Sequence, residues 1–383
     1  MRRIYLDHNA TTPVHPDALK AMLPFLEANY GNPSSIHFLG REARAALDDA
    51  RERLAKLLGG KSGEIVFTGS GTEADNHAIF GAVRARAGKV RHVITSAVEH
   101  HAVLHSCEYL RDHEGVEITV LPVDGDGVVN PDDVRSAIRD DTALVSVMWA
   151  NNETGALQPV REIGAICRER GVLFHTDAVQ ALGKVPVRVG DVPVDLLSVS
   201  SHKVYGPKGV GALWIRPRTK IESLVHGGSH ENDHRAGTEN VAGIVGFVRA
   251  AEIAAAKVEN EDTRLRALTE RLWQGLSAGI ERVHRNGPAD RRVANTLNVS
   301  FAGCKSDALL MSLDLEGIAV SSGSACAVGS FKPSSVLLAM GLGAEMANAA
   351  VRFSLGAGTT EADVDTVVNA MPKIVTRLRS FAV

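Results

Sequence analysis

An aspartate and a lysine that each follow a short apolar run are the residues of this sequence best suited to chemistry. Asp177 ends the run VLFHTD, and Lys203 follows LLSVSSH further along the chain. If both runs are strands of an open α/β sheet, their carboxyl ends face a common crevice, so the two side chains can reach one ligand. Because each residue alone is more often a surface charge than a catalyst, the interpretation depends on the pair.

A glycine-containing junction, Gly69-Ser-Gly-Thr72, lies between a β-branched run and a helix that opens with Glu73. Free backbone N–H groups and the positive end of a helix dipole make such a junction an anion site, and glycine lets a phosphate approach closely. A lysine for an imine, a carboxylate for a ring nitrogen and donors for a phosphate together suit pyridoxal phosphate. The letters GSGTEA also satisfy the relaxed dinucleotide pattern G-x-G-x-x-A, so an NAD-dependent oxidoreductase stays a remote alternative. The nearest acidic candidate, Glu99, follows the strand at 92–96 rather late.

A sheet must position these residues, and the apolar pattern predicts one. Short β-branched runs alternate with longer amphipathic stretches, which is typical of α/β proteins. We expect strands at residues 64–68, 92–96, 118–122, 143–148, 172–175, 196–200 and 211–215, and helices at 73–86, 101–113, 131–137 and 160–170. The seven strands predict one large, mainly parallel sheet.

The pattern changes after about residue 258 and predicts a second, smaller α+β domain. We expect a charged helix at 259–276, a strand at 295–301, a helix from about Asp307 and a final amphipathic helix at 361–381. The predicted domains are a large cofactor-binding domain over residues 16–257 and a small domain made of residues 1–15 and 258–383.

The composition excludes several classes of protein. With 42 Lys and Arg against 45 Asp and Glu, the net charge of the 383 residues is −3, so no global positive field would gather nucleic acid or an anionic membrane. The apolar stretches are shorter than the roughly 18 residues of a membrane span, and the first residues lack a signal-peptide core, so we expect a cytoplasmic protein. No metal site is expected, because the four cysteines lie far apart and His101 and His105 have no third ligand.

Ten motifs give this sequence a resemblance to a known family. They are YLDHNATTP, GNPSSIH, FTGSGTEADN, VEHHAVL, NNETG, HTDAVQALGK, SSHKVYGPKGVG, RAGTENVAG, SSGSAC and RFSLG, in that order over nearly the whole chain. The sequence resembles the IscS/NifS cysteine desulfurases, which are class V, aspartate-aminotransferase-like enzymes of fold type I that depend on pyridoxal phosphate. The resemblance implies L-cysteine as the substrate, L-alanine as the product and a homodimer.

The resemblance also implies roles for single residues. Lys203 would hold the cofactor covalently, Asp177 would hold its ring nitrogen, and His100 would stack on the ring. The other implied cofactor contacts are Gly71, Thr72, Ser200 and His202 at the phosphate, Gln180 at the ring oxygen and Thr238 at the phosphate of the neighbouring subunit. Asn151 would contact cofactor or substrate. Arg352 would bind the substrate carboxylate in a bidentate manner, through two N–H donors of its guanidinium.

Cys326 would be the catalytic nucleophile. It lies in SSGSACAVGS, whose small residues provide little anchoring, so we expect a mobile loop over residues 321–335 and an extended segment from Cys326 to Arg352, as in the long-loop branch of the family. As a thiolate, Cys326 would attack the substrate sulfur and retain it as a persulfide. The implied acceptors are an iron–sulfur cluster scaffold, a transfer-RNA thiolation relay or a DNA-sulfur-modification protein.

Two further alternatives stay open. A selenocysteine lyase or another C–S lyase would use the same cofactor, whereas a non-enzymatic partner that kept the fold would use none. The segment Gly227–Arg235 departs from the family pattern at His230, Asn232 and Asp233, close to the expected dimer interface and active-site mouth.

Overall fold

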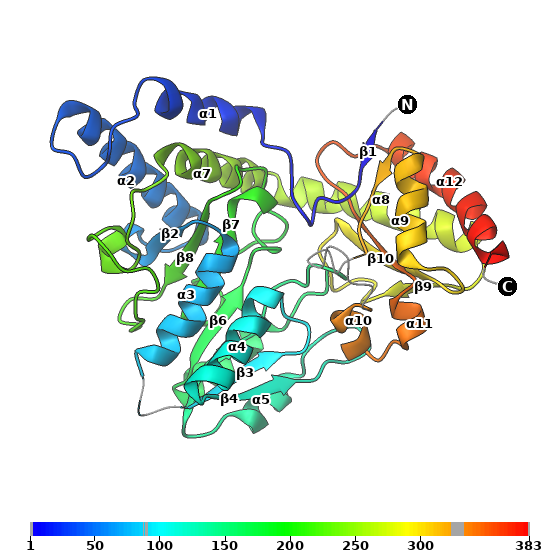
Figure 1. Cartoon of the computed structure of the whole chain (residues 1–383), viewed down its shortest axis with the longest axis horizontal. Helices are drawn as coiled ribbons and strands as arrows, with labels where there is room; N and C mark the ends of the chain where they lie inside the picture. The colour runs from blue at the N-terminus through cyan, green and yellow to red at the C-terminus, as the bar shows by residue number, and fades with distance from the viewer. Residues whose placement is uncertain (1–2, 87, 89–90, 323–332, 382–383) are drawn as a thin grey trace.

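The chain builds two lobes, which lie side by side in Figure 1. The computed structural model describes residues 3–86, 88, 91–322 and 333–381. The larger lobe contains the helices α1 (Pro16–Glu27), α2 (Phe38–Leu58), α3 (Gly71–Arg84), α4 (His101–Glu114), α5 (Pro131–Ala137), α6 (Val160–Arg170) and α7 (Val241–Ala256). Its strands are β2 (Ile65–Thr68), β3 (His92–Ser96), β4 (Glu117–Leu121), β5 (Thr142–Ser146), β6 (Leu173–Asp177), β7 (Leu196–Ser200) and β8 (Gly211–Ile215). Short 3-10 helices lie at η1 (Ser62–Glu64), η2 (Ser201–Lys203) and η3 (Glu231–Asp233).

The strands of the larger lobe form one seven-stranded sheet with the order β2-β8-β7-β6-β5-β3-β4. The pairs β3–β4, β3–β5, β5–β6 and β6–β7 are parallel, and only β8 runs antiparallel to its neighbours β2 and β7. The predicted large, mainly parallel sheet is therefore confirmed. The strands were readable in the sequence because a sheet covered on both faces needs apolar residues on both sides of each strand.

Helices cover both faces of this sheet. Phe174 and Phe247 belong to the core that the sheet shares with α2, α6 and α7, and Ile79 and Leu110 belong to the core that it shares with α3 and α4. This layered arrangement is the usual solution for a sheet that is apolar on both faces. It also brings the carboxyl ends of β6 and β7 to one edge, where Asp177 and Lys203 follow.

The remaining elements belong mostly to the smaller lobe. They are β1 (Ile4–Tyr5), α8 (Val258–Gly279), β9 (Val283–Asn286), β10 (Thr296–Phe301), α9 (Ser306–Leu315), β11 (Ile318–Ala319), α10 (Ser335–Ala339), α11 (Ala344–Ala347), β12 (Ala350–Ser354) and α12 (Glu361–Ser380). A three-stranded antiparallel sheet, β12-β10-β9, packs against α8, α9 and α12 around a core that includes Leu272, Phe301 and Phe353. β1 pairs with β11, so the start of the chain joins this lobe.

The prediction of an extended segment from Cys326 to Arg352 is wrong for residues 335–352, where α10, α11 and the first part of β12 lie. Val336 and Leu337 are buried against Val98 and Ala350, so apolar contacts fold this stretch onto the rest of the chain. Cys326 and most of the predicted 321–335 loop lie outside the described residues.

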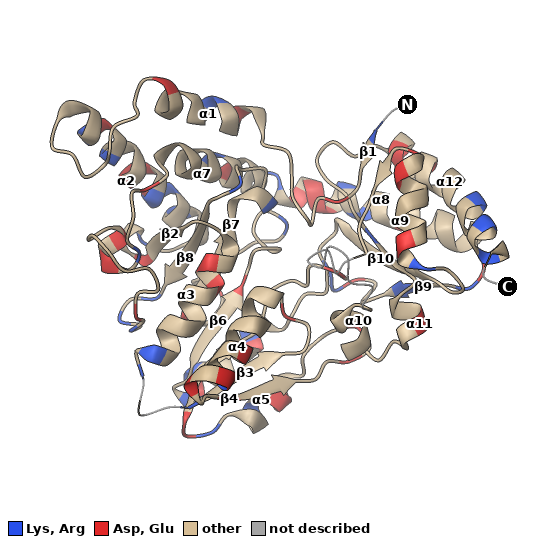
Figure 2. Ribbon diagram, viewed as in Figure 1, with Lys and Arg blue, Asp and Glu red and all other residues tan. Residues whose placement is uncertain are grey.

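Basic and acidic residues are interspersed along the ribbon of both lobes, as Figure 2 shows. None of the helices described here has the length and apolar character needed to cross a membrane. Within the same residues, no group of three or more His, Cys, Asp and Glu side chains is arranged to hold a metal ion.

Candidate active site

A cavity of about 390 Å³, called the front cavity below, lies where the sheet ends and α3 begins. Its walls include nine of the residues that the sequence singles out, namely Gly71, Thr72, His100, Asp177, Gln180, Ser200, His202, Lys203 and Arg352. The fold thus brings together residues from four segments of the larger lobe and one strand of the smaller lobe. The remaining walls include Asn9 and Ala10 of the N-terminal segment.

One end of the front cavity is suited to a phosphate. The hydroxyl of Ser70 caps α3 by accepting a hydrogen bond from the backbone N–H of Glu73 at 3.1 Å, so the helix starts at Gly71. A Cβ at Gly71 would lie 2.8 Å from Val179 Cγ2, and therefore glycine is required there. The buried Oγ of Ser200 has no hydrogen-bond partner within the described chain. Because buried hydroxyls are nearly always satisfied, this unpaired donor fits a ligand oxygen beside the helix N-terminus.

Asp177 and Lys203 provide the acid and the amine of the front cavity. Burial raises the pKa of Asp177 to about 6, while the N–H of Val179 and the charge of Lys203 act in the opposite direction. Asp177 Oδ1 accepts that N–H bond at 2.8 Å, which fixes the carboxylate. Lys203 Nζ donates to the carbonyl oxygens of Asn9 at 2.5 Å and Ala10 at 2.8 Å. A cationic ligand group beside Asp177 would favour the ionised form of the Asp177 carboxylate.

Two histidines of the cavity are held neutral near pH 7. Burial, followed by the charge of Lys203, lowers the pKa of His100 to about 4. His100 also caps α4, because its Nδ1 accepts from the N–H of Ala102 at 3.1 Å, which places the ring proton on Nε2. Burial lowers the pKa of His202 to about 4 as well, and its Nδ1 lies 3.2 Å from Oγ1 of Thr11. Neutral rings of this kind can stack on an aromatic ligand without a charge penalty.

Arg352 on β12 closes the cavity from the smaller lobe and is only 2% exposed. Its Nη2 donates to Asp7 Oδ1 at 2.7 Å and its Nη1 to the carbonyl oxygen of Asn152 at 2.9 Å. The buried Nε has no partner within the described chain. The guanidinium is therefore fixed in place and retains a free donor, which suits a carboxylate ligand.

Two predicted site residues of the described chain, Asn151 and Thr238, do not line the front cavity. The Asn151 side chain shapes its own turn: Oδ1 accepts from the N–H of Glu153 at 2.8 Å, and Nδ2 donates to the carbonyl of Val98 at 2.9 Å. The neighbouring Asn152 lines the cavity instead. Thr238 is exposed on the isolated chain, and Cys326 lies outside the described residues. The roles of these three residues stay predictions.

The segment Gly227–Arg235, for which the sequence predicts a departure from the family pattern, is anchored close to the start of α3. Glu231 is buried and its Oε2 accepts from Arg51 Nη1 at 2.5 Å and from the N–H of Phe67 at 2.8 Å. Arg235 Nε donates to Glu73 Oε1 at 2.9 Å, in the first turn of α3. Asn232 and Asp233 are exposed, so the departing residues lie on the outer side of this anchor.

Asn9, Ala10 and Asp75 also line the front cavity, although they were not predicted from the sequence. Asp75 is buried, and its burial together with the charge of Asp177 raises its pKa well above the ordinary value. Asp75 lies in the motif FTGSGTEADN and Asn9 in YLDHNATTP, so both motifs carried a signal. The place of Asn9 in the cavity depends on how the N-terminal segment crosses Lys203, which the sequence does not show.

The seven-stranded sheet with its adjoining α+β lobe defines a fold type I α/β architecture, and comparison with known proteins gives the same result. The chain belongs to the aminotransferase class-V family, which it matches over residues 4–367. It is 49% identical over 381 residues to a cysteine desulfurase IscS of Dictyoglomus turgidum, covering 100% of this chain and 96% of the relative. The structure is similar to that of a NifS-like protein (TM-score 0.93, 38% identity, 98% and 100% coverage) and to that of SspA in complex with cysteine (TM-score 0.81, 35% identity, 92% and 98% coverage).

Proposed function

We propose that this chain is a pyridoxal-phosphate-dependent cysteine desulfurase, which converts L-cysteine to L-alanine and passes the sulfur to an acceptor protein. The full-length similarity to a protein named cysteine desulfurase IscS supports the proposal. The observation that carries it is the single cavity in which Lys203, Asp177 and the start of α3 meet. An amine, a buried acid and a phosphate site are the three groups that this cofactor requires of a protein.

The residues present fit the cofactor. Gly71, Thr72 and the unpaired hydroxyl of Ser200 would hold the phosphate, and Asp177 would pair with the ring nitrogen. His202 would add to the phosphate site, Gln180 would face the ring oxygen, His100 would cover the ring and Lys203 would be the covalent attachment. When bound, pyridoxal phosphate withdraws electrons from the α-carbon of an amino acid, which makes the α-proton acidic and the C–S bond breakable.

The chain's own residues would then orient the substrate and move protons. Arg352, fixed by Asp7 and Asn152, would bind the carboxylate of L-cysteine. Lys203, released as a free amine, would move the α-proton while the carbonyls of Asn9 and Ala10 keep its Nζ in place. His100 would stay neutral at pH 7, because burial lowers its pKa.

Cys326 would accept the sulfur. In this step the Cys326 thiolate forms an S–S bond with the substrate sulfur, the C–S bond breaks, and the electron pair of that bond stays with carbon, which takes up a proton. L-alanine leaves and the persulfide stays on Cys326 until an acceptor thiol removes its outer sulfur. An iron–sulfur scaffold, a transfer-RNA thiolation relay and a DNA-sulfur-modification protein are the acceptor classes that we propose, with a cytoplasmic location.

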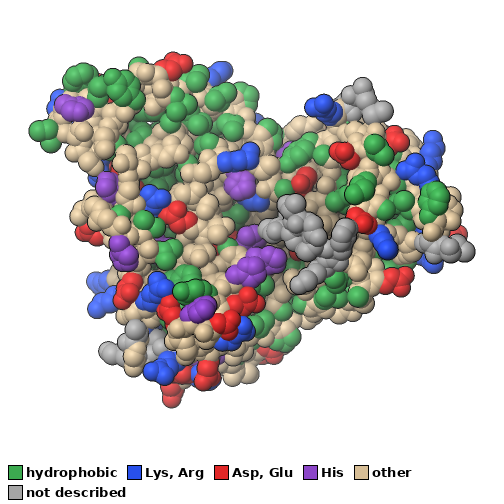
Figure 3. All heavy atoms as spheres, viewed as in Figure 1, with side chains coloured by type: hydrophobic (Ala, Val, Ile, Leu, Met, Phe, Trp, Pro, Cys, Tyr) green, Lys and Arg blue, Asp and Glu red, His purple; other side chains and the backbone are tan. Residues whose placement is uncertain are grey.

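We propose a homodimer as the working form and two domains with the boundaries 16–257 and 1–15 plus 258–383. The separate apolar cores of the two lobes support the domain boundaries. For the dimer, Leu19, Leu23, Leu26, Ile36 and Phe38 are exposed, and Figure 3 shows apolar side chains gathered over α1 and the start of α2. An apolar surface of this kind is usually covered in the working protein, here by a second copy of the chain. Sedimentation of the purified protein as a monomer at micromolar concentration would contradict the dimer.

Measuring alanine and sulfide released from L-cysteine in the presence of dithiothreitol tests the function. The wild-type protein should be yellow and release both products in equal amounts, whereas Cys326→Ser should keep the visible absorption band and lose sulfide release by on the order of 100-fold or more. Cys304→Ala is the matched control, since Cys304 lies in the smaller-lobe core, and should keep the activity.

The assay separates the alternatives. Full activity of Cys326→Ser would refute the nucleophile, and faster turnover of L-selenocysteine than of L-cysteine by that variant would favour a selenocysteine lyase. A colourless wild-type protein that binds NAD and forms no alanine would overturn the proposed function.

A further inference from the structure

Lys184 is an inward-facing lysine that the catalytic roles proposed above do not use. Its Nζ donates to the side-chain oxygen of Asn9 at 2.9 Å and to Oε1 of Gln180. Gln180 is 4% exposed and lines the front cavity. Lys184 therefore contacts a cavity residue through its side chain without lining the front cavity itself.

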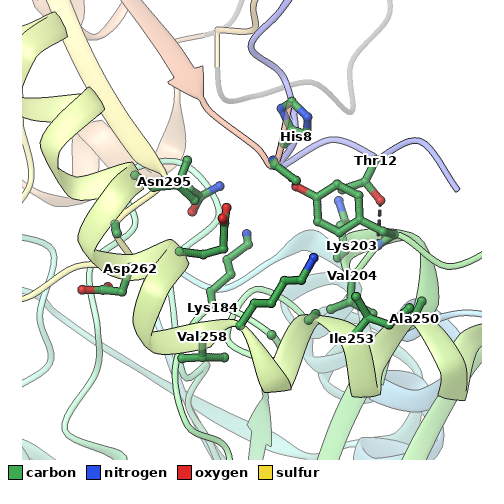
Figure 4. A pocket seen from close by; sticks show the side chains of 18 of the residues that line it. His8, Thr12, Lys184, Lys203, Val204, Ala250, Ile253, Val258, Asp262 and Asn295 are labelled. Atoms are coloured by element: carbon green, nitrogen blue, oxygen red, sulfur yellow. Dashed lines mark hydrogen bonds between the residues drawn. The ribbon is translucent and has the colours of Figure 1, made fainter. Parts of the chain in front are cut away.

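Lys184 lines a second cavity, called the rear cavity below, which has a volume of about 180 Å³. The rear cavity lies between the N-terminal segment and the junction of α7 with α8, and Lys203 lines both cavities. Figure 4 shows Lys184 and Lys203 in its wall, with Ala250 and Ile253 of α7 below them. Lys184 and Gln180 thus form part of the wall that separates the two cavities.

The contact with Lys184 sets the orientation of the Gln180 side-chain amide, that is, where its oxygen and its nitrogen point. Lys184 Nζ donates to Oε1 of Gln180 as well as to the side-chain oxygen of Asn9, so the amide oxygen of Gln180 points to Lys184 and the amide nitrogen points away from it. The Gln180 Nε2 indeed donates to the carbonyl oxygen of Asn9 at 2.9 Å, the same oxygen that accepts from Lys203. With the amide flipped, two donor groups would face each other in a buried place, which is costly.

We propose that Lys184 is a positioning residue that fixes the orientation of the Gln180 amide, so that its N–H and not its carbonyl is offered to the ring oxygen of the cofactor. This inference rests on the proposed function, because Gln180 is placed at the ring oxygen only there. A phenolate oxygen is an acceptor, so a carbonyl in that place would repel it. Lys184 acts through Gln180 and is not itself a catalytic residue.

The surroundings of Lys184 are consistent with a positioning role, but they also allow a purely structural role. Burial lowers its pKa well below the usual value, and the charges of Lys203 and Arg352 act in the same direction. A lysine is costly at such a place unless its donors are used. The competing role is structural, since Asn9 also accepts from Asn295 Nδ2 at 3.0 Å and so links Lys184 to the smaller lobe.

A double-mutant cycle separates the two roles. Lys184→Met is made in the wild-type protein and in Gln180→Ala, and Lys257→Met, at an exposed lysine that lines the rear cavity, is the control. The measurements are the dissociation constant of pyridoxal phosphate, the wavelength of its bound absorption band and the melting temperature of the cofactor-free protein. Should Lys184→Met fail to fold, Lys184→Gln, which keeps one donor, enters the same cycle.

We expect Lys184→Met to raise the dissociation constant roughly 10-fold, the loss of about one hydrogen bond, and to shift the absorption band. In the Gln180→Ala background the same substitution should change the dissociation constant by no more than about twofold and leave the absorption band where it is. The reason is that the residue through which Lys184 acts is absent. Equal losses in both backgrounds, or a lower melting temperature with unchanged cofactor binding, would overturn the inference in favour of the structural role. A wild-type protein that binds no pyridoxal phosphate would instead overturn the proposed function.

Discussion

The front and rear cavities share Lys203 but differ in the groups that surround it. The front cavity combines a helix N-terminus, a buried acid and the unpaired hydroxyl of Ser200. The rear cavity is walled largely by apolar side chains of α7 and α8, such as Ile253 and Leu265, and its Glu261 is already paired with Arg264 at 2.7 Å. The front cavity therefore offers two buried donors without partners in the described chain, Ser200 Oγ and Arg352 Nε, to an anionic ligand. The chemistry open to Lys203 therefore depends on the groups around it and not on the lysine alone.

The largest expected effect separates the shared Lys203 from Lys257, which lines the rear cavity alone. Lys203→Ala should remove the covalent attachment of the cofactor and lower alanine formation by on the order of 10³-fold, because the proton-transfer group is lost as well. Lys257→Ala, on the rear side, should leave both unchanged. The visible absorption band after borohydride reduction and the rate of alanine formation check this prediction. A covalent adduct that survives in Lys203→Ala would show that another amine holds the cofactor.

Adding a methyl group to the front wall and removing side-chain carbons from the rear wall should affect different properties of the protein. In Gly71→Ala the new methyl would approach Val179 Cγ2 to 2.8 Å in the front wall, so cofactor affinity should fall about 10- to 100-fold with a small loss of stability. Leu265→Ala in the rear wall should instead destabilise the fold by about 2–5 kcal/mol and leave the affinity of the folded protein unchanged. Fluorescence titration and urea unfolding measure the two quantities. Equal affinity losses in both variants would remove the distinction between the cavities.

Ser200→Ala tests the unpaired hydroxyl of the front cavity. We expect cofactor affinity to fall roughly 10-fold, because a hydrogen bond to a charged phosphate is lost. The cofactor-free protein should unfold at the same urea concentration as the wild type or slightly higher, since the buried hydroxyl has no partner there. Thermal and urea unfolding with and without pyridoxal phosphate give both numbers. A less stable cofactor-free variant with normal affinity would contradict the phosphate role.

The smallest expected effect concerns the acid groups beneath the front cavity. Burial raises the pKa of Glu99 to about 8, so the folded chain holds a proton that the unfolded chain releases at its ordinary pKa of 4.5. The stability that depends on this proton is fully present below pH 4.5 and is lost as the pH rises through 8. Glu99→Gln mimics the protonated group and should gain stability relative to the wild type between pH 5 and pH 9.

Urea midpoints at several pH values measure this difference, and the exposed Glu281→Gln is the control. A constant difference between Glu99→Gln and the wild type over the whole range would show that the carboxyl is ionised in the folded protein.

Much of the fold could be predicted because its signals are local. Strands β3, β7 and β8 and helices α5 and α6 have the predicted bounds, since each is a short run whose ends are marked by turn or capping residues. Helices α1, α2 and α7 were missed. In α2 the residues Ala43, Leu47, Ala50 and Leu54 carry a helical spacing that could have been read, whereas α7 is apolar on most sides and is defined by the layers that it joins.

The sequence by itself determined the chemistry of the site, because the order and spacing of Gly71, Asp177 and Lys203 are properties of single strand ends and helix starts. The tertiary structure alone decided how the N-terminal segment crosses Lys203, that Asn152 lines the cavity where Asn151 shapes a turn, and that Lys184 contacts Gln180. These are contacts between segments distant in sequence, or choices of side-chain direction within one turn. Neither has a periodic signature along the chain, because each depends on the groups that surround the side chain once the chain has folded.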